Sequence, residues 1–282
     1  MRRQKNSMRA FVMIVFAIFL ATAGGVRAQI PTATPSPSPK SLEKEFFRNI
    51  LRDQKAIWTA PFHLHRADAK WMIPSGIGAM ALFTTDRITG DQIADSQRQV
   101  KASQIVSYAG SVYGLGAVAT TFYLVGRKKS DDRARETGIL SAEALADSLI
   151  VSGALKEIAQ RARPLEGRER SEFFDGGNSF PSGHSVQVWS VAAVIANEYH
   201  DRQLIKLAAY GIASAVSVAR FTERKHYISD VVVGSAAGYA IGRYVYKAHH
   251  RDPSITQSRW PAIVPHYSRS ARQYGVGLTW SF

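Results

Sequence analysis

The chain has 282 residues, and its 36 Lys and Arg against 22 Asp and Glu give a formal net charge of +14 at pH 7. It contains no cysteine, so disulfide bonds are excluded and packing must stabilise the fold. A basic chain of this size suits an anionic substrate or an anionic membrane surface.

The first 28 residues have the features of an export signal. Basic residues crowd the first nine positions, an apolar stretch covers 10–23, and Val26-Arg27-Ala28 places small residues where a signal would be cleaved. We therefore expect residues 1–28 to be a signal peptide, with an uncleaved signal anchor as the alternative. Without them the chain keeps a net charge of +9, and an exported chain without a binding motif is not expected to bind nucleic acid.

Residues 29–40 form a Pro-rich linker, with four prolines among Thr, Ala and Ser. After it, helical periodicity predicts runs at 42–58, 74–85, 103–125, 141–162, 185–199, 204–220 and 229–247. Strand signals are nearly absent before residue 260. The sequence thus predicts an all-α domain over residues 41–260, a bundle of about six helices with its active site at one end.

The predicted helix 141–162 leads to a pair of cations. Lys156 and Arg163 are seven residues apart, almost two helical turns, which would place them on one face about 10 Å apart. Pro164 would then end the helix. Such a pair is often only a solvated basic stripe, but it can also bind one phosphate group between its charges.

Two further clusters lie at the starts of predicted helices. Pro181-Ser182-Gly183-His184 precedes a helical run, where free backbone N–H groups and the helix dipole favour an anion. His226 and Asp230 are four residues apart, so the carboxylate can hold one imidazole nitrogen and leave the other nucleophilic. Each cluster alone has an ordinary explanation as a cap or surface pair, but together they predict a phosphoryl-transfer site.

The three stretches resemble the signature motifs of the type 2 phosphatidic acid phosphatase and vanadium haloperoxidase superfamily. Its first pattern, Lys, six residues and Arg-Pro, is met from Lys156 to Pro164, and its second, Pro-Ser-Gly-His, by residues 181–184. Its third, Arg, five residues, His, three residues and Asp, is met by Arg220, His226 and Asp230. The resemblance is close over residues 141–243. One position departs, because Ala219 stands where the third motif usually has Ser.

The resemblance implies a metal-independent phosphatase without a cofactor. In such an enzyme His226 would attack phosphorus and form a phosphohistidine, Asp230 would orient His226, and His184 would protonate the leaving oxygen. The groups implied to neutralise the phosphate oxygens are Lys156, Arg163, Arg220, the Ser182 hydroxyl and the Gly183 backbone N–H.

The expected substrate is a phosphate monoester or diphosphate ester, with a lipid phosphate or polyprenyl diphosphate favoured over a small soluble ester. Two alternatives remain open. A vanadium-dependent haloperoxidase would use the same anion pocket, with His226 as the ligand of vanadate. A non-catalytic binding or structural protein of the cell envelope is the other.

Histidines outside these motifs are not assigned to a site. His63 and His65 are interpreted as ordinary loop residues because no cluster of partners lies near them in the sequence, so no metal site is expected. His249 and His250 follow the last predicted helix in a basic segment and are interpreted as a surface pair.

Glycines at 234, 238 and 242 recur every four residues on the last predicted helix. This spacing puts them on one face, where a neighbouring helix can approach closely. The pattern predicts helix packing and not a nucleotide-binding loop.

Two architectures are open with respect to a membrane. If five helices from residue 103 onward span it, the basic loop 127–135 lies inside and all three motifs lie outside, in agreement with the positive-inside rule. Only the run 103–125 is a full-length uncharged stretch, so a soluble or membrane-surface bundle is the alternative. In both, the active site is expected to face the periplasm.

Residues 261–282 are predicted as a β-like tail. Apolar residues alternate strictly with Gly, Thr and Ser from Tyr274 to Phe282, and the pattern resembles the last strand of bacterial outer-membrane barrels. One strand cannot close a barrel. We expect a short hairpin with residues 262–269 as its partner, covering the flank of the bundle.

Overall fold

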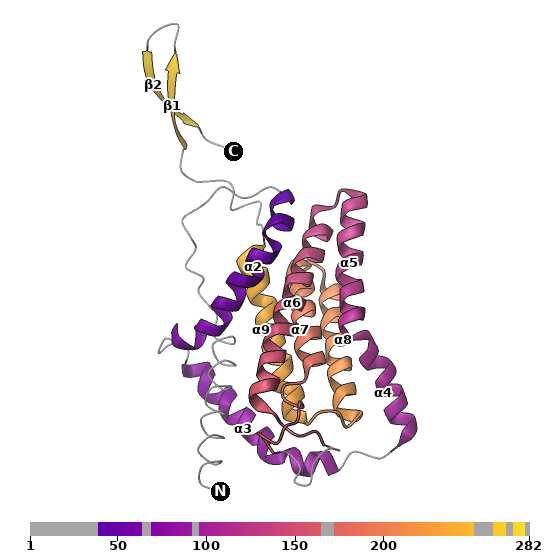
Figure 1. Cartoon of the computed structure of the whole chain (residues 1–282). Helices are drawn as coiled ribbons and strands as arrows, with labels where there is room; N and C mark the ends of the chain where they lie inside the picture. The colour runs from indigo at the N-terminus through magenta and orange to yellow at the C-terminus, as the bar shows by residue number, and fades with distance from the viewer. Residues whose placement is uncertain are drawn as a thin grey trace.

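The computed structural model describes residues 39–63, 69–91, 96–164, 172–250, 262–268 and 273–279. The expected signal peptide and most of the Pro-rich linker lie outside these ranges. In the described residues the chain forms a helical bundle and a hairpin (Figure 1), whose elements are α2 (Pro39–Thr59), η1 (Ala60–His63), α3 (Ala69–Asp91), α4 (Gln97–Ala109), α5 (Val112–Lys129), α6 (Asp132–Ala159), α7 (Gly183–Glu198), α8 (Gln203–Thr222), α9 (Ile228–His249), β1 (Ala262–Ser268) and β2 (Gln273–Thr279). The predicted all-α class is confirmed.

Helix α7 is the centre of the bundle and packs against α6, α8 and α9. The approach of α9 is very close, because a Cβ atom on Gly238 would lie 2.1 Å from the Val186 carbonyl oxygen and one on Gly242 would lie 2.0 Å from that of Ser190. The close packing predicted from the glycine spacing is confirmed. It places the starts of α7 and α9 side by side.

Apolar clusters fill the two sides of α7. On one side Ile57 of α2 and Ile241 of α9 pack with Val194 of α7. On the other side Leu115 of α5 and Val216 of α8 pack against the opposite face of α7. Every helix of the central bundle therefore has its position fixed by burial against α7 or against a helix that contacts it.

The single helix predicted over residues 103–125 is wrong, because the chain breaks into α4 and α5 at Gly110-Ser111. A Cβ atom on Gly110 would lie 2.4 Å from Val216 Cγ1, so glycine allows α4 to reach α8. The Ser111 hydroxyl then caps α5 by accepting a hydrogen bond from the Gly114 N–H at 3.2 Å. Figure 1 shows α4 set at an angle to α5.

The predicted bounds of the helix at 141–162 are also wrong at both ends. Helix α6 begins at Asp132, where the Asp131 carboxylate caps it by accepting from the Ala134 N–H at 3.1 Å. It ends at Ala159, because Gln160 adopts a left-handed conformation with φ of 44°. Arg163 therefore lies beyond the helix and does not share a helical face with Lys156.

Helix α2 is joined to the bundle by polar contacts as well as apolar ones. The Asn49 amide donates to Glu143 Oε1 of α6 at 3.0 Å, and His249 Nε2 at the end of α9 lies 2.8 Å from Asp53 Oδ2. Asn49, Asp53 and Glu143 are buried. The interpretation of His249 as a surface residue is therefore wrong, since it pairs with a buried carboxylate.

Three helical stretches in the described residues are long and apolar enough to cross a membrane: Gln97–Lys129, Asp132–Ala159 and Gln203–Thr222. The apolar window of Asp132–Ala159 is 67% buried in the molecule, whereas those of the other two are 22% buried. Exposed side chains on the latter include Tyr113 and Leu207. The α4–α5 and α8 faces thus present apolar surface outward, as a lipid-facing surface requires.

The C-terminal hairpin is present. Strands β1 and β2 pair antiparallel, with Ala262 opposite Thr279 and Ser268 opposite Gln273. In Figure 1 the hairpin lies apart from the helices, so the prediction that it covers their flank is wrong.

Candidate active site

The residues of the three motifs meet at one end of the bundle, as predicted. Lys156 lies in the last turn of α6, Ser182 is the N-cap of α7, Arg220 lies in the last turn of α8, and Asp230 lies in the first turn of α9. In Figure 1 this end lies at the bottom of the view, next to α3. Four helix ends therefore contribute to one site.

The chain after α6 is held in place by backbone hydrogen bonds to residues 172–179. The Ala162 N–H donates to the Glu172 carbonyl at 3.1 Å, and the Ser179 N–H donates to the Arg161 carbonyl at 2.8 Å. Gly177 makes this pairing possible, because a Cβ atom there would lie 2.3 Å from the Arg161 carbonyl oxygen. The segment is fixed without regular secondary structure.

Asn178 brings together the two cations of the first motif. Lys156 Nζ donates to the Asn178 carbonyl oxygen at 2.8 Å, and Arg163 Nε donates to Asn178 Oδ1 at 2.8 Å. A Cβ atom on Gly183 would lie 4.0 Å from Lys156 Nζ, so the ammonium group lies beside the first residue of α7. Lys156 and Arg163 were expected to pair on one helical face, but the loop residue Asn178 brings them together instead. They lie next to the N-terminus of α7, which also attracts anions.

His226 is held by a backbone carbonyl. Its Nδ1 lies 2.7 Å from the Ser179 carbonyl oxygen, and because a carbonyl can only accept, Nδ1 carries the hydrogen and Nε2 is left as the basic nitrogen. The side chain is 2% exposed. Burial lowers the pKa of His226 to about 4, although Asp230 acts in the opposite direction, so the ring is neutral at pH 7.

Asp230 does not form the direct hydrogen bond to His226 that the spacing predicted. Its Oδ2 lies 3.8 Å from His226 Nδ1, beyond hydrogen-bond length, and instead accepts from the Ser179 hydroxyl at 2.6 Å and from the Tyr227 N–H at 2.9 Å. Burial alone would raise the pKa of Asp230, but Arg161, the nearby His226 and the Ser179 hydroxyl lower it to about 2. The carboxylate thus fixes Ser179, whose carbonyl holds the histidine.

Arg161 is a buried residue that contacts the candidate site and that the sequence analysis missed. Its guanidinium is fully buried and donates to Asp230 Oδ1 at 2.5 Å and to Asp86 Oδ2 of α3 at 2.6 Å. Asp86 also accepts from the Ser229 N–H at 3.1 Å, and the Arg161 Cζ lies 4.3 Å from the centre of the Tyr227 ring. Its only sequence signal was the basic run before Pro164. The motif pattern assigns Arg163 in that run to the site and leaves Arg161 without a role.

His184 lies among the site's positive charges. Burial lowers the pKa of His184, and together with the nearby charges of Arg220, His226, Lys156 and Arg163 it brings the pKa to about 4. The imidazole is therefore neutral at pH 7 when no anion is bound, and a bound phosphate would favour its protonation. The positive charge around His184 suits the binding of an anion.

Two further contacts join the motifs to each other. The Ser182 N–H donates to the Asp230 carbonyl oxygen at 3.1 Å, which ties the start of α7 to the start of α9. Arg220 is oriented by Glu223, whose Oε2 accepts from its Nη1 at 2.7 Å. Ala219, where the resembling family has Ser, is buried, and none of these contacts requires a hydroxyl there.

Comparison with known proteins gives a family match for the segment that carries the motifs. Residues 137–253 match the PAP2 superfamily. The segment contains all the motif residues, so the family resemblance stated from the motifs is confirmed.

Individual relatives are more distant. The lipid A 1-phosphatase of Porphyromonas gingivalis is 34% identical over 70 residues, which are 24% of this chain and 16% of that protein. A PA-phosphatase related-family protein of Dictyostelium discoideum is 26% identical over 171 residues, which are 52% of this chain and 61% of that protein. The chain thus spans less than two thirds of either curated relative.

Among solved structures, the chain is similar to a transmembrane PAP2 type phosphatidylglycerolphosphate phosphatase from Bacillus subtilis. The TM-score is 0.44 and the identity 18%, over 74% of this chain and 94% of that one.

Proposed function

We propose that this protein is a metal-independent phosphoric ester hydrolase that works through a phosphohistidine at His226. The observation that carries the proposal is the hydrogen bond from His226 Nδ1–H to the Ser179 carbonyl, which leaves Nε2 as a neutral nucleophile. A buried histidine with one fixed nitrogen, surrounded by several cations, suits attack on a phosphoryl group.

The reaction has two steps. Nε2 of His226 attacks phosphorus, the ester P–O bond breaks as the N–P bond forms, and the leaving oxygen takes a proton from His184. His184, now neutral, accepts a proton from the water that hydrolyses the N–P bond, and phosphate leaves while His226 returns to its neutral state. Asp230, acting through Ser179, keeps Nδ1 protonated in both steps.

The cations supply the electrostatic part of catalysis. Lys156, Arg163 and Arg220 neutralise the equatorial oxygens that carry charge in the transition state, together with the Ser182 hydroxyl and the Gly183 N–H. Lys156 has three N–H donors, so its bond to the Asn178 carbonyl leaves two for the substrate. Asn178 thereby orients the lysine before the substrate arrives.

The substrate class that we propose is a lipid phosphate or polyprenyl diphosphate. Two features support it: the outward-facing apolar surface of α5 and α8, and the names of the relatives, one of which is a lipid A 1-phosphatase. A substrate whose apolar part lies in a membrane reaches a site next to such surfaces by lateral diffusion.

We also propose that the site faces the periplasm. The last turn of α5 carries Arg127, Lys128 and Lys129, at the end of the bundle opposite the motif residues. Basic residues next to membrane spans favour the cytoplasmic side, which would leave the motifs on the outer side.

Trapping of the phosphoenzyme tests the proposal. The purified protein, mixed with a substrate carrying labelled phosphate and quenched in detergent, should yield an acid-labile, base-stable labelled enzyme, and His226→Gln should abolish both the label and phosphate release. His200→Gln is the matched control, because His200 is exposed beyond α7. Near-normal turnover in His226→Gln would remove the nucleophile from the proposal. Halide oxidation with vanadate and peroxide, without phosphatase activity, would favour the haloperoxidase alternative.

A further inference from the structure

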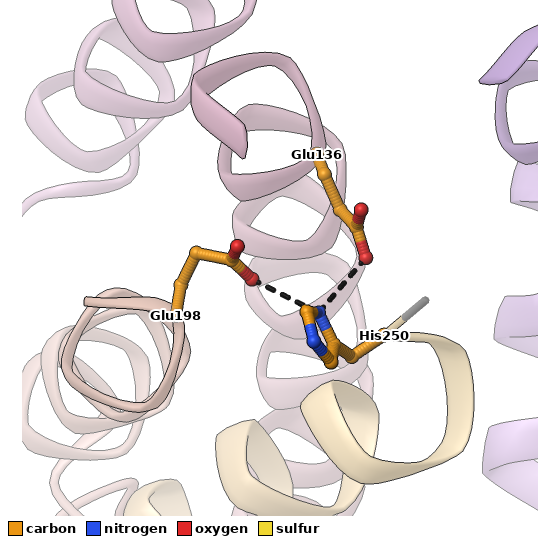
Figure 2. A group of neighbouring side chains, drawn as sticks. All are labelled: Glu136, Glu198 and His250. Carbon is orange, nitrogen blue, oxygen red and sulfur yellow. Dashed lines mark hydrogen bonds and ion pairs between the residues drawn. The ribbon is translucent and has the colours of Figure 1, made fainter. Parts of the chain in front are cut away.

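A second cluster of ionisable side chains lies at the far end of the helices that build the candidate active site. Glu136 lies in the second turn of α6, Glu198 is the last residue of α7, and His250 follows the end of α9. Figure 2 shows the three side chains converging from three helices. None of them belongs to the three motifs, and His250, interpreted from the sequence as a surface residue, is half-buried and faces two carboxylates.

The three side chains meet at the imidazole of His250. Its Nδ1 lies 3.1 Å from Glu136 Oε1 and 3.2 Å from Glu198 Oε2, and the ligand atoms of all three residues lie within 4.8 Å of one another. The ring is oriented by stacking on Tyr246, with centroids 4.4 Å apart and an angle of 16° between the planes. The position of Nδ1 is therefore fixed by packing.

At the centre of the cluster, one imidazole nitrogen faces two carboxylates. Nδ1 can donate one hydrogen, and if Glu136 accepts it, Glu198 Oε2 has no hydrogen-bond partner among the described residues although the side chain is only 4% exposed. Arg133 is also near, and its Nε lies 3.9 Å from the other oxygen, Oε1, of Glu198. Its guanidinium hydrogen bonds go to the Asp201 carboxylate and to the Glu198 main-chain carbonyl. A buried carboxylate oxygen without a donor is unfavourable unless a cation lies close by.

The distances suit a metal ion. Tetrahedral Zn²⁺ with ligand bonds of about 2.0 to 2.2 Å separates neighbouring ligand atoms by roughly 3.3 Å, close to the two separations found at His250 Nδ1. One imidazole and two carboxylates favour Zn²⁺ and similar transition-metal ions over Mg²⁺ or Ca²⁺, which prefer oxygen ligands throughout.

We propose that Glu136, Glu198 and His250 bind one divalent transition-metal ion, of which Zn²⁺ is the best fit, and that this ion clamps the ends of α6, α7 and α9. The metal would replace the proton at His250 Nδ1 and give Glu198 Oε2 its missing partner. The site is separate from the chemistry, because Lys156 lies 20 residues further along α6, about 30 Å at 1.5 Å per residue. The metal's role is to hold helices, and the proposal does not depend on the phosphatase function.

The test uses untagged, full-length protein in detergent, stripped with a chelator and dialysed against Zn²⁺. We expect one tightly bound equivalent by elemental analysis and a rise in Tm on adding Zn²⁺, with little change from Mg²⁺ at the same concentration. The variants His250→Ala and Glu198→Gln should bind Zn²⁺ at least about 100-fold more weakly, since even outer-shell changes weaken metal binding 10- to 100-fold.

Three matched controls separate this site from other histidines. His200→Ala alters an exposed histidine near the end of α7, His249→Gln alters the partner of Asp53, and His226→Gln alters the candidate active site. All three should keep the bound equivalent. If a ligand variant fails to fold, Co²⁺ added to the unchanged protein gives the readout: intense visible bands of tetrahedral coordination support the site, and the weak spectrum of hydrated Co²⁺ overturns it. Equal Zn²⁺ binding in all variants, or none in the unchanged protein, also overturns it and leaves an ion-paired triad.

Discussion

At the residue scale, two histidines with similar pKa values must act in opposite protonation states. His226 has to be neutral to attack, and its lowered pKa of about 4 provides this at every pH above that value. His184 has to be protonated to help the leaving group, and its pKa of about 4 opposes this in the free site. The negative charge of the bound phosphate is what reconciles them, because it lies next to His184 and raises its pKa.

This conflict predicts a displacement between two pH profiles. The basic limb of kcat/KM, which reports the free enzyme, should begin at a lower pH than the basic limb of kcat, which reports the substrate complex. We expect a separation of at least about one pH unit, since a neighbouring charge shifts a pKa by this amount or more. Steady-state rates from pH 4 to 9 on one substrate measure it, and superimposable limbs would contradict the role of substrate charge.

His184→Ala is the companion variant. It should remove the basic limb and lower kcat most for alkyl esters, roughly 100-fold or more, while an activated aryl ester, whose leaving group needs no proton, should lose much less. Equal losses on both esters would contradict an acid role for His184.

The site also shows what can be predicted from single residues and what cannot. The motif residues were predicted because their types and spacing are specific, and they do meet at one end of the bundle. The hydrogen bonds were not predictable, because they depend on the loop 172–179: Asn178 joins Lys156 to Arg163, and the Ser179 carbonyl takes the place expected for Asp230 on His226. Sequence spacing carries no information about backbone carbonyls from a distant loop.

At the element scale, the buried triad of Asp86, Arg161 and Asp230 joins α3 to the start of α9. Removing one member of a buried ion pair leaves uncompensated charge, so Arg161→Met should destabilise the fold by about 3 to 5 kcal/mol. Adding Asp86→Asn should restore part of that loss, because the triad members are energetically coupled. Unfolding in denaturant measures both variants.

Arg48→Met is the control for the triad. Arg48 pairs with Glu45 on the surface at 4.0 Å, and a surface pair contributes about 1 kcal/mol or less. If Arg161→Met were as mild as Arg48→Met, the triad would not be what positions Asp230.

The contact between α7 and α9 gives another prediction at this scale. Gly242→Ala puts a methyl group where only 2.0 Å separates it from the Ser190 carbonyl oxygen, so the two helices must separate. We expect a loss of stability of about 1 to 3 kcal/mol, the usual range for overpacking. Activity should also fall, since the starts of these helices carry Ser182, Gly183, His184 and Asp230.

Gly211→Ala on α8 is the matched control, because a Cβ atom there meets nothing within 4 Å. Alanine favours helix over glycine by up to about 1 kcal/mol, so this variant should be neutral or slightly stabilised in thermal unfolding. Similar behaviour of the two alanine variants would show that the close helix contact is not required.

At the scale of the whole molecule, periodicity was sufficient for the fold class, because each helix buries one face against its neighbours. It was insufficient where a helix ends inside a helix-compatible sequence. The breaks at Gly110-Ser111 and at Gln160 follow from tertiary contacts, of α4 with Val216 and of the chain after α6 with residues 172–179. Placing the hairpin on the flank failed for a related reason: alternation of residue types predicts a strand but not what it packs against.

The last prediction concerns the orientation of the whole molecule, and the absence of native cysteines makes it testable. Asp175 is exposed at the candidate active-site end, and Lys128 is exposed at the opposite, basic end. In a bacterial host with the outer membrane opened and the inner membrane intact, an impermeant thiol reagent should label Asp175→Cys fully. Lys128→Cys should be labelled only after the inner membrane is lysed if the helices span it, because the basic end would then lie inside. Labelling of both positions in intact cells would favour a periplasmic bundle on the membrane surface, whereas protection of Asp175→Cys would place the catalytic end in the cytoplasm and contradict the proposed orientation.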